Sequence, residues 1–281
     1  MAVTYEFPEG MRIANLDERR VYYETEFNLK AVAEWLSFRG SEEQIKRTTA
    51  FAFIVGRHTG VYLPEFEEIK NKVVVVDNYE GFEDLKDYIL RYLPEGVYYD
   101  RNVYISLEEC RKCEKCYREC WNCSCFVGQE LAFDIDPENV ECPVHGTLED
   151  KMKRGQGLSF CMYEFDAVRE ATLRLWEELE KEFEDMRVVF SGRGFHIHVI
   201  DEEAIRMSYT ERKEISRKFS SYPIDEWVTT GGSRLIRLPY SLNALVSRIV
   251  TPLKIEDVLD FDPRYDRRCI PRFLGRDYAE G

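Results

Sequence analysis

Two aspartates stand one residue apart inside an apolar run, and this pair restricts what the surrounding chain can form. Residues 131–136 read LAFDID, which predicts a β-strand whose alternate side chains share a face. Asp134 and Asp136 then lie side by side, and burial makes the repulsion between neighbouring carboxylates more costly. Either the strand ends in solvent, where the acids are merely polar, or the pair binds divalent cations. This segment alone leaves both interpretations open.

Size and charge limit the class of protein. A chain of 281 residues with 44% hydrophobic residues can bury a substantial core within one large domain. Its formal net charge of −14 excludes a surface that is basic throughout, but not a local basic channel. The first twenty residues hold no apolar core of signal-peptide length, and no apolar run is long enough to span a membrane. We therefore expect a cytoplasmic protein with no membrane contact.

The nine cysteines are spread unevenly, and six of them fall within sixteen residues. These six are Cys110, Cys113, Cys116, Cys120, Cys123 and Cys125. Several of them are spaced as C-x2-C pairs, and Cys142 and His145 form a C-x2-H pair. Two such pairs brought together make a closed tetrahedral zinc site. In an intracellular chain such a cluster favours metal binding over disulfides, although intracellular proteins of hyperthermophiles do use disulfides. Disulfides therefore stay open as an alternative, and so does the choice of the four metal ligands. Cys269 is expected to be a buried or free thiol.

Helical and strand patterns alternate along the chain. Helical spacing of apolar residues predicts helices in residues 27–38, 82–93 and 165–183. Strands are predicted in residues 50–63 (two strands around Gly56), 97–107, 131–136, 187–190, 195–200 and 234–238. We predict one α/β (α+β) catalytic domain over residues 1–281, with a cysteine-rich stem, residues 107–128, projecting from a hairpin. Residues 142–161 are the segment that can complete the stem.

A glycine-containing turn joins two of these strands. It reads Ser191, Gly192, Arg193, Gly194, and glycines let a backbone approach a phosphate closely. Ser191 and Arg193 add hydrogen-bond donors for phosphate oxygens. His196 and His198 follow and alternate onto one face. A plain hairpin with satisfied histidines explains the same pattern, so the turn is weak support by itself.

A third stretch, residues 223–243, combines an acid with arginines. Asp225 stands beside apolar residues, and Arg234 and Arg237 lie three residues apart around Leu-Ile. On a strand the two arginines point to opposite faces, whereas on a turn they can converge. Taken alone, this stretch is a charged strand edge.

Together the three stretches resemble the catalytic small subunit of archaeal and eukaryotic DNA primases, within the primase-polymerase superfamily. FDID, SGRGFH and IDEWVTTGGSRLIRLPYSL occur in the order and at the approximate spacing of that family's motifs. Weaker similarity begins at RTTAFAFIVGRHTGVY, so the resemblance covers residues 47–252. It implies a catalytic core of mixed sheets flanked by helices. The family also carries a zinc knuckle near its first motif, which strengthens the expectation of a structural zinc ion.

The resemblance implies template-directed nucleotidyl transfer in DNA replication. Asp134, Asp136 and Asp225 would hold two Mg²⁺ or Mn²⁺ ions that stabilise the attacking and leaving oxygens. The repulsion between neighbouring aspartates then becomes attraction to the cations. Residues expected to bind the nucleotide are Ser191, Arg193, His196, Arg234, Arg237 and Asn243.

Two departures from the family pattern concern the nucleotide pocket. The family has S-G-x-x-G-x-H where this chain has a shorter S-G-R-G-F-H, so Arg193 can fall short of the family's position. Asn243 occupies the place of a family histidine. These differences suggest a divergent member.

We predict an enzyme that synthesises or extends primers on a single-stranded DNA template from nucleoside triphosphates. A second primase subunit, or a fused helicase or accessory domain, is a candidate partner, because an acidic chain needs help to hold template. The C-terminal residues end without a clear stop, which leaves open that the chain is part of a longer protein. Two alternatives are a zinc-containing nucleic-acid-binding module and a non-catalytic structural subunit of a replication complex.

Overall fold

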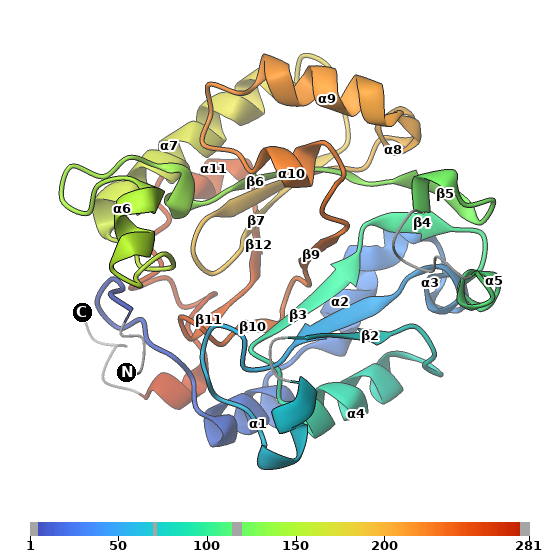
Figure 1. Cartoon of the computed structure of the whole chain (residues 1–281), viewed down its shortest axis with the longest axis horizontal. Helices are drawn as coiled ribbons and strands as arrows, with labels where there is room; N and C mark the ends of the chain where they lie inside the picture. The colour runs from blue at the N-terminus through green and yellow to red at the C-terminus, as the bar shows by residue number, and fades with distance from the viewer. Residues whose placement is uncertain (1–4, 70–71, 114–119, 276–281) are drawn as a thin grey trace.

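Two four-stranded antiparallel sheets form the centre of the molecule (Figure 1). The computed structural model describes residues 5–69, 72–113 and 120–275. The first sheet has the order β2-β1-β3-β9, with bounds Val73–Val76, Phe51–Ile54, Gly96–Asp100 and Leu235–Arg237. The second has the order β12-β7-β8-β6, with bounds Thr251–Leu253, Met186–Phe190, Phe195–Val199 and Leu131–Ile135. Two short pairs complete the strands: β4 (Asn102–Tyr104) with β5 (Phe126–Gln129), and β10 (Leu242–Asn243) with β11 (Arg248–Ile249).

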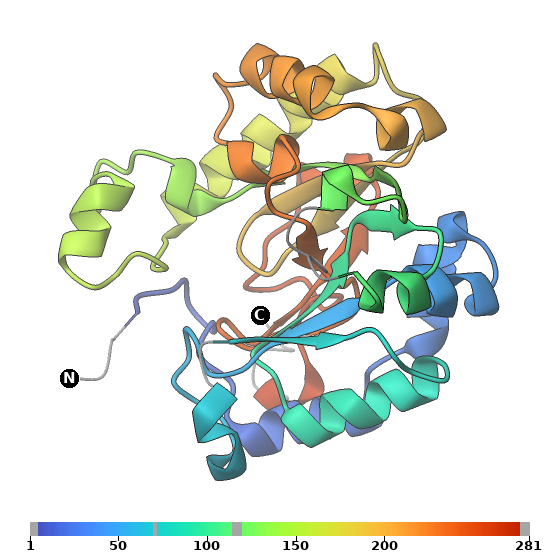
Figure 2. The same ribbon diagram turned by 45° about the vertical axis from the view of Figure 1, so that its right-hand side comes forward.

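Helices cover the outer side of each sheet, so that strands lie between two helical layers (Figure 2). The helices nearest the first sheet are α1 (Leu16–Thr25), α2 (Leu29–Leu36), α3 (Glu42–Thr48) and α4 (Phe82–Tyr92). Those nearest the second sheet are α7 (Met162–Leu179), α8 (Glu202–Arg206), α9 (Tyr209–Lys218), α10 (Glu226–Thr229) and α11 (Ile255–Val258). Two more, α5 (Leu107–Arg111) and α6 (Leu148–Lys153), lie at opposite sides of the view in Figure 1. Short 3-10 turns span Ser37–Arg39, Pro64–Ile69, Cys120–Asn122, Pro137–Asn139 and Arg272–Leu274.

Each sheet has its own hydrophobic core. On α4 the apolar residues Phe82, Leu85 and Ile89 recur at helical spacing and are buried against the first sheet. On β6 the side chains of Phe133 and Ile135 point into the second core. Asp134 lies between them in sequence and therefore points to the opposite face of β6, away from that core. The alternation of strand side chains thus delivers a carboxylate to the space between the sheets.

The predicted α/β (α+β) class is confirmed, and the predicted helices and most predicted strands are present. One strand prediction is wrong: residues 50–63 hold β1 but no second strand beyond Gly56. Gly56 has a φ of +64°, as a tight turn requires. After Gly56 the chain contacts α1 and does not pair with β1: the Val61 carbonyl accepts a hydrogen bond from the buried Arg19 guanidinium of α1 at 3.1 Å. The partner of β1 is β2 instead. Within the described residues, no helix is long and apolar enough to cross a membrane.

Candidate active site

A cavity of about 230 Å³ lies where the two sheets face one another. Strands β6 and β8 and the turn after β7 line one side, and β3, β9 and β10 line the other. Residues from all three sequence motifs meet here. The predicted site residues that line the cavity are Asp134, Asp136, Ser191, Arg193, His196, Arg237 and Asn243.

Asp134 and Asp136 stand at the end of β6, on the cavity face. Asp134 is opposite His196 in the β6–β8 register, and His196 Nε2 lies 3.4 Å from Asp134 Oδ1. That oxygen is buried and has no hydrogen-bond partner among the described residues. Burial raises the pKa of Asp134 well above its ordinary value, and the charges of Asp136, Asp225 and Glu138 add to the effect. A bound cation would satisfy this oxygen and reverse the penalty.

Asp225 adjoins the pair without lining the cavity. Its backbone N–H donates to the Asp134 carbonyl oxygen at 2.8 Å, and its carboxylate caps α10 by accepting from Trp227 N at 2.8 Å. Its side-chain charge is close enough to raise the pKa of Asp134. The three carboxylates are therefore neighbours. Among the described residues, however, they do not form a group whose oxygens all lie within 4.8 Å of one another.

Arg193 binds the acidic residues of the site. Its guanidinium is buried and donates to Asp136, to Glu138 at 2.9 Å and to the Leu158 carbonyl at 3.3 Å. Burial lowers the pKa of Arg193, but the carboxylates of Asp136 and Glu138 outweigh it and raise the pKa overall. Its sequence position predicts that this arginine binds the nucleotide, and this stays a prediction. In the structure Arg193 lines the cavity and is a fixed positive charge beside the carboxylates.

Arg237 at the end of β9 and Arg234, the residue before β9, contact different parts of the structure. Arg237 lines the cavity and lies over the Tyr98 ring, with its Cζ 5.0 Å from the ring centroid. Arg234 forms an ion pair with the buried Asp100 and does not line the cavity. Of the two arginines, Arg237 alone lines the cavity.

The glycines of the turn after β7 permit close packing within the protein. Gly192 has a φ of +102°, a left-handed conformation that favours glycine. A Cβ on Gly194 would collide with the Ile135 carbonyl oxygen at the end of β6. Asn243 fixes the turn from the other side, because its Nδ2 donates to the Ser191 carbonyl at 3.1 Å. The turn therefore supports the end of β6 that carries the aspartates.

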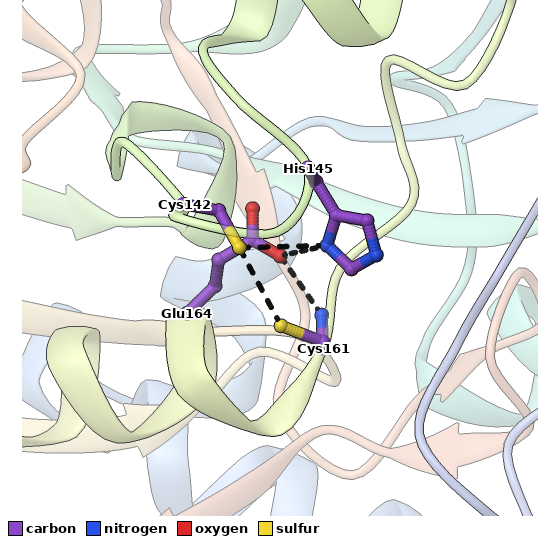
Figure 3. Close-up of side chains that lie close together, drawn as sticks. All are labelled: Cys142, His145, Cys161 and Glu164. Carbon is purple, nitrogen blue, oxygen red and sulfur yellow. Dashed lines mark hydrogen bonds and ion pairs between the residues drawn. The ribbon is translucent and has the colours of Figure 1, made fainter.

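A second cluster of polar residues lies at the N-terminus of α7 (Figure 3). Cys142, His145, Cys161 and Glu164 bring one ligand atom each to within 4.8 Å of one another, so the group can hold a metal ion. The Cys142 sulfur lies 3.5 Å from His145 Nδ1 and 3.8 Å from the Cys161 sulfur. His145 Nδ1 is 3.3 Å from Glu164 Oε2, and the other oxygen of Glu164 accepts from the buried Lys151 at 2.7 Å.

The structure divides the predicted zinc ligands into two places. Cys142 and His145 meet Cys161 and Glu164 beside α6, and they do not approach the stem, which lies beyond β4 and β5 (Figure 1). Within the stem, the described cysteines are Cys110, Cys113, Cys120, Cys123 and Cys125. Cys116 lies outside the described residues. The thiols of Cys113, Cys120, Cys123 and Cys125 are not in disulfides, and Cys269 is a buried thiol as expected.

Sequence reasoning missed three residues of these sites. Glu138 follows Asp136 by two positions and lines the cavity, so the pattern D-x-D-x-E contained the signal. Tyr98 also lines the cavity. The sequence of a strand separates its two faces but does not show which face lines a cavity. Glu164 follows Cys161 by three residues, the same spacing as Cys142 and His145. A search for paired spacings that includes carboxylates would have found it.

Similarity to known proteins identifies the family of the chain. No family model matches the chain. An uncharacterized DNA primase small subunit-like protein of Archaeoglobus fulgidus is 58% identical over 272 residues, 96% of this chain and 94% of that one. The DNA primase small subunit of Thermococcus kodakarensis is 30% identical over 205 residues, which span 73% of this chain but only 49% of that subunit. The polymerase domain of Mycobacterium tuberculosis ligase D in complex with DNA covers 96% of each chain at 13% identity, with a TM-score of 0.48.

The Archaeoglobus relative decides the family, because its similarity extends over nearly the whole of both chains. The Thermococcus relative, similar over 205 residues, is named as a DNA primase small subunit. This chain belongs to the family of DNA primase small subunit-like proteins.

Proposed function

We propose that the chain is a template-directed nucleotidyltransferase that synthesises or extends primers on single-stranded DNA. One observation carries the proposal: the cavity gathers residues from three separate motifs around a buried Asp134 oxygen that no described group satisfies. A buried, unpaired carboxylate oxygen is costly in a protein unless a cation occupies the site in the working state. Family membership supports the same function, since one named relative is a DNA primase small subunit and the other a DNA primase small subunit-like protein.

The residues of the cavity suit a nucleoside triphosphate with divalent cations. Asp134 and Asp136, with Asp225 beside them, would hold Mg²⁺ or Mn²⁺, which neutralises charge on the transferring phosphoryl group. Arg237 supplies a positive charge on the opposite wall, and Ser191 a hydroxyl. Burial, and then the charges of His198 and Arg237, lower the pKa of His196 well below its ordinary value. His196 therefore contributes a hydrogen bond without adding a charge.

The template strand is proposed to pass beside α10. Trp227 is 65% exposed, only two residues after Asp225. Its indole lies against Gly232, where a Cβ would collide with the ring. One face of the ring is thus supported by the backbone. Exposed aromatic rings are the usual stacking surfaces for bases of single-stranded nucleic acid, and they do not require a basic surface.

Nucleotide binding tests this assignment through Arg237 of β9 and Arg234, the residue before β9. Arg237→Ala is expected to weaken binding of a fluorescent nucleoside triphosphate, in the presence of Mn²⁺, by roughly ten- to a hundredfold, because a charge-assisted hydrogen bond is lost. Arg206→Ala, which removes an exposed arginine of α8, should leave the affinity unchanged. Arg234→Ala should lower the melting temperature without a comparable loss of affinity, since it leaves the buried Asp100 without its arginine.

The same titration separates the alternatives. A nucleic-acid-binding module would bind single-stranded DNA and show no saturable nucleotide binding. A structural subunit would bind neither. Equal nucleotide affinity in the wild-type protein and Arg237→Ala would remove Arg237 from the pocket.

We also propose that Cys142, His145, Cys161 and Glu164 bind a structural zinc ion. Zinc–ligand bonds of about 2.0–2.3 Å in a tetrahedron place two sulfurs about 3.8 Å apart, and sulfur and nitrogen about 3.5 Å apart. The observed separations of 3.8 Å between the sulfurs and 3.5 Å between Cys142 and His145 equal these values. Glu164 is fixed by Lys151, the kind of support that orients a metal ligand. The ion would join the loop after β6 to the start of α7.

A further inference from the structure

We propose that the rings of Trp227, Trp121 and Tyr209, with Arg101 and Arg212 buried behind them, bind a single strand of nucleic acid outside the cavity. The three rings are called the aromatic surface below. The inference deepens the proposed function and rests on it, because it continues the path of the template beyond Trp227. It also supplies what an acidic chain needs, since a net charge of −14 requires a local source of affinity for a polyanion.

The aromatic surface begins at the edge of the cavity. Trp227 belongs to α10, and the next residue, Val228, lines the cavity. A Cβ on Gly232 would lie 2.6 Å from Trp227 Cδ2, and a Cβ on Gly231 would lie 2.8 Å from Trp121 Cζ2. The two indole rings therefore contact adjacent residues of one backbone segment, although they are distant in sequence.

Tyr209 continues the aromatic surface at the start of α9, which packs beside α10 (Figure 1). Its ring centroid lies 6.5 Å from that of Trp121, with the rings edge to face. Tyr209 is 48% exposed and Trp227 is 65% exposed, whereas Trp121 is half-buried. Exposed rings of this kind stack the bases of single-stranded nucleic acid whatever their sequence, because every base has a π face.

Two fully buried arginines lie behind these rings. The Arg212 guanidinium lies over Trp121, with its Cζ 5.6 Å from the ring centroid. Arg101 donates to the carbonyls of Val228 and Ser233, on either side of the two glycines. Within the described part of the chain, both guanidinium groups donate only to backbone carbonyls. Arg101 Nε and Arg212 Nη1 have no hydrogen-bond partner there.

The charges of these two arginines are poorly compensated inside the protein. Burial lowers the pKa of Arg212 to about 9, and the charge of Arg101 adds to the effect. Burial also lowers the pKa of Arg101. The charge of Glu130 acts on both arginines in the opposite sense, but its carboxylate is already bound by Tyr99 and His198. Arginine stays protonated in proteins, so an anion outside the rings would stabilise both charges.

Exposed carboxylates near the aromatic surface oppose this attraction only weakly. Glu226 precedes Trp227 and Glu211 follows Tyr209 by two residues, and both glutamates are exposed. Salt screens charges that face water over about 8–10 Å, whereas it screens buried charges much less. The buried arginines therefore attract the phosphates, and stacking on the rings supplies the remaining affinity.

Binding of an oligonucleotide tests the proposal. The full chain would be titrated against fluorescein-labelled oligothymidylate of about 15 nucleotides, within the range of known site sizes, and followed by fluorescence anisotropy. Trp227→Ala and Tyr209→Ala are each expected to weaken binding roughly five- to a hundredfold, the usual effect of removing a stacking ring. Tyr209→Phe should keep the wild-type affinity, because stacking needs the ring and not the hydroxyl. Tyr265→Ala removes a tyrosine that is 52% exposed in the loop after α11, and it should change nothing.

Salt dependence tests the role of buried rather than exposed charge. Since few cations contact the phosphates directly, the affinity should fall by less than about tenfold between roughly 50 and 200 mM salt. A fall of about a thousandfold would show that many exposed cations bind the backbone, and it would contradict the proposal. Equal affinity of the wild type, Trp227→Ala and Tyr209→Ala would overturn it as well. If those two substitutions instead abolish a dimer in sedimentation, the aromatic surface belongs to a second copy of this chain.

Nucleotide incorporation by the same proteins separates this inference from the proposed function. Wild-type incorporation on a template that all variants bind equally would keep the enzyme and remove the aromatic surface. Binding that depends on Trp227 and Tyr209, without incorporation by the wild type, would keep the aromatic surface and contradict the enzyme.

Discussion

Replacing Asp134 or Asp136 with asparagine is expected to reduce nucleotide incorporation by well over a hundredfold while leaving the fold intact. Loss of a group that merely orients a metal ligand typically costs ten- to a hundredfold, and these residues are the proposed ligands themselves. The variants should also melt differently from the wild-type protein without metal. The pKa of Asp134 is raised by burial and by its acidic neighbours, so between the unfolded and the folded pKa the folded state binds more protons than the unfolded state.

Proton binding by Asp134 determines whether the free energy of unfolding rises or falls with pH. For an acid with a raised folded pKa, the free energy of unfolding falls as pH rises from the unfolded pKa of about 4 towards the folded pKa. Asp134→Asn removes this penalty, so the metal-free variant should melt at a higher temperature than the wild type at pH 7. Mn²⁺ should raise the melting temperature of the wild type and leave that of the variant nearly unchanged. Wild-type incorporation rates in either variant would contradict the assignment of the metal ligands.

Glu130→Gln is expected to cause the largest loss of stability of any single change near the site. Glu130 is completely buried and accepts hydrogen bonds from Tyr99 at 2.9 Å and from His198 at 2.5 Å, with Arg39 at 3.4 Å. Removing one partner of a buried ionic network leaves the others uncompensated and costs about 3–5 kcal/mol. In a chain of this size the melting temperature should fall by roughly 5–15 °C.

The effect has a matched control and a pH dependence. Glu202→Gln removes a carboxylate of similar size from the exposed ion pair with Arg206 and should not change the melting temperature measurably. Burial raises the pKa of Glu130, but the hydrogen bond and charge of His198 outweigh it, so the pKa is lowered overall. Its stabilising contribution is therefore complete above the unfolded pKa of about 4.3 and is lost as pH falls through the folded value. A Glu130→Gln variant that melts with the wild type at pH 7 would show that the network does not support the fold.

Regular patterns along the chain predicted much of the fold. The period of apolar residues in α4 and α7 identified both helices, because a helix that covers a sheet buries one stripe of side chains. The sequence also predicted the strand with Asp134 and Asp136, since successive side chains of a strand lie on opposite faces. The same period predicted that Arg234 and Arg237 would point to opposite faces if their segment were a strand; the strand includes Arg237 and begins one residue after Arg234.

Other features depend on contacts that no local pattern contains. The strand β1 pairs with β2, and Val61, in the expected second strand of the hairpin at Gly56, instead accepts a hydrogen bond from Arg19 of α1. The ion pairs of Arg193 with Asp136 and Glu138 join two strand ends that are distant in sequence, so the sequence of the turn did not predict them. The separation of Cys142 and His145 from the stem follows from the course of β6 between them (Figure 1). Spacing shows which residues can form a site, whereas tertiary packing decides which of them meet.

Template-directed incorporation tests the central claim most directly. The wild-type protein would be incubated with a single-stranded homopolymer template, labelled ribo- or deoxyribonucleotides and either Mg²⁺ or Mn²⁺. The account predicts incorporation of the complementary nucleotide only, dependent on template and divalent ion, and absent in Asp136→Asn. Folded wild-type protein that binds the template but incorporates no nucleotide under any of these conditions would contradict it.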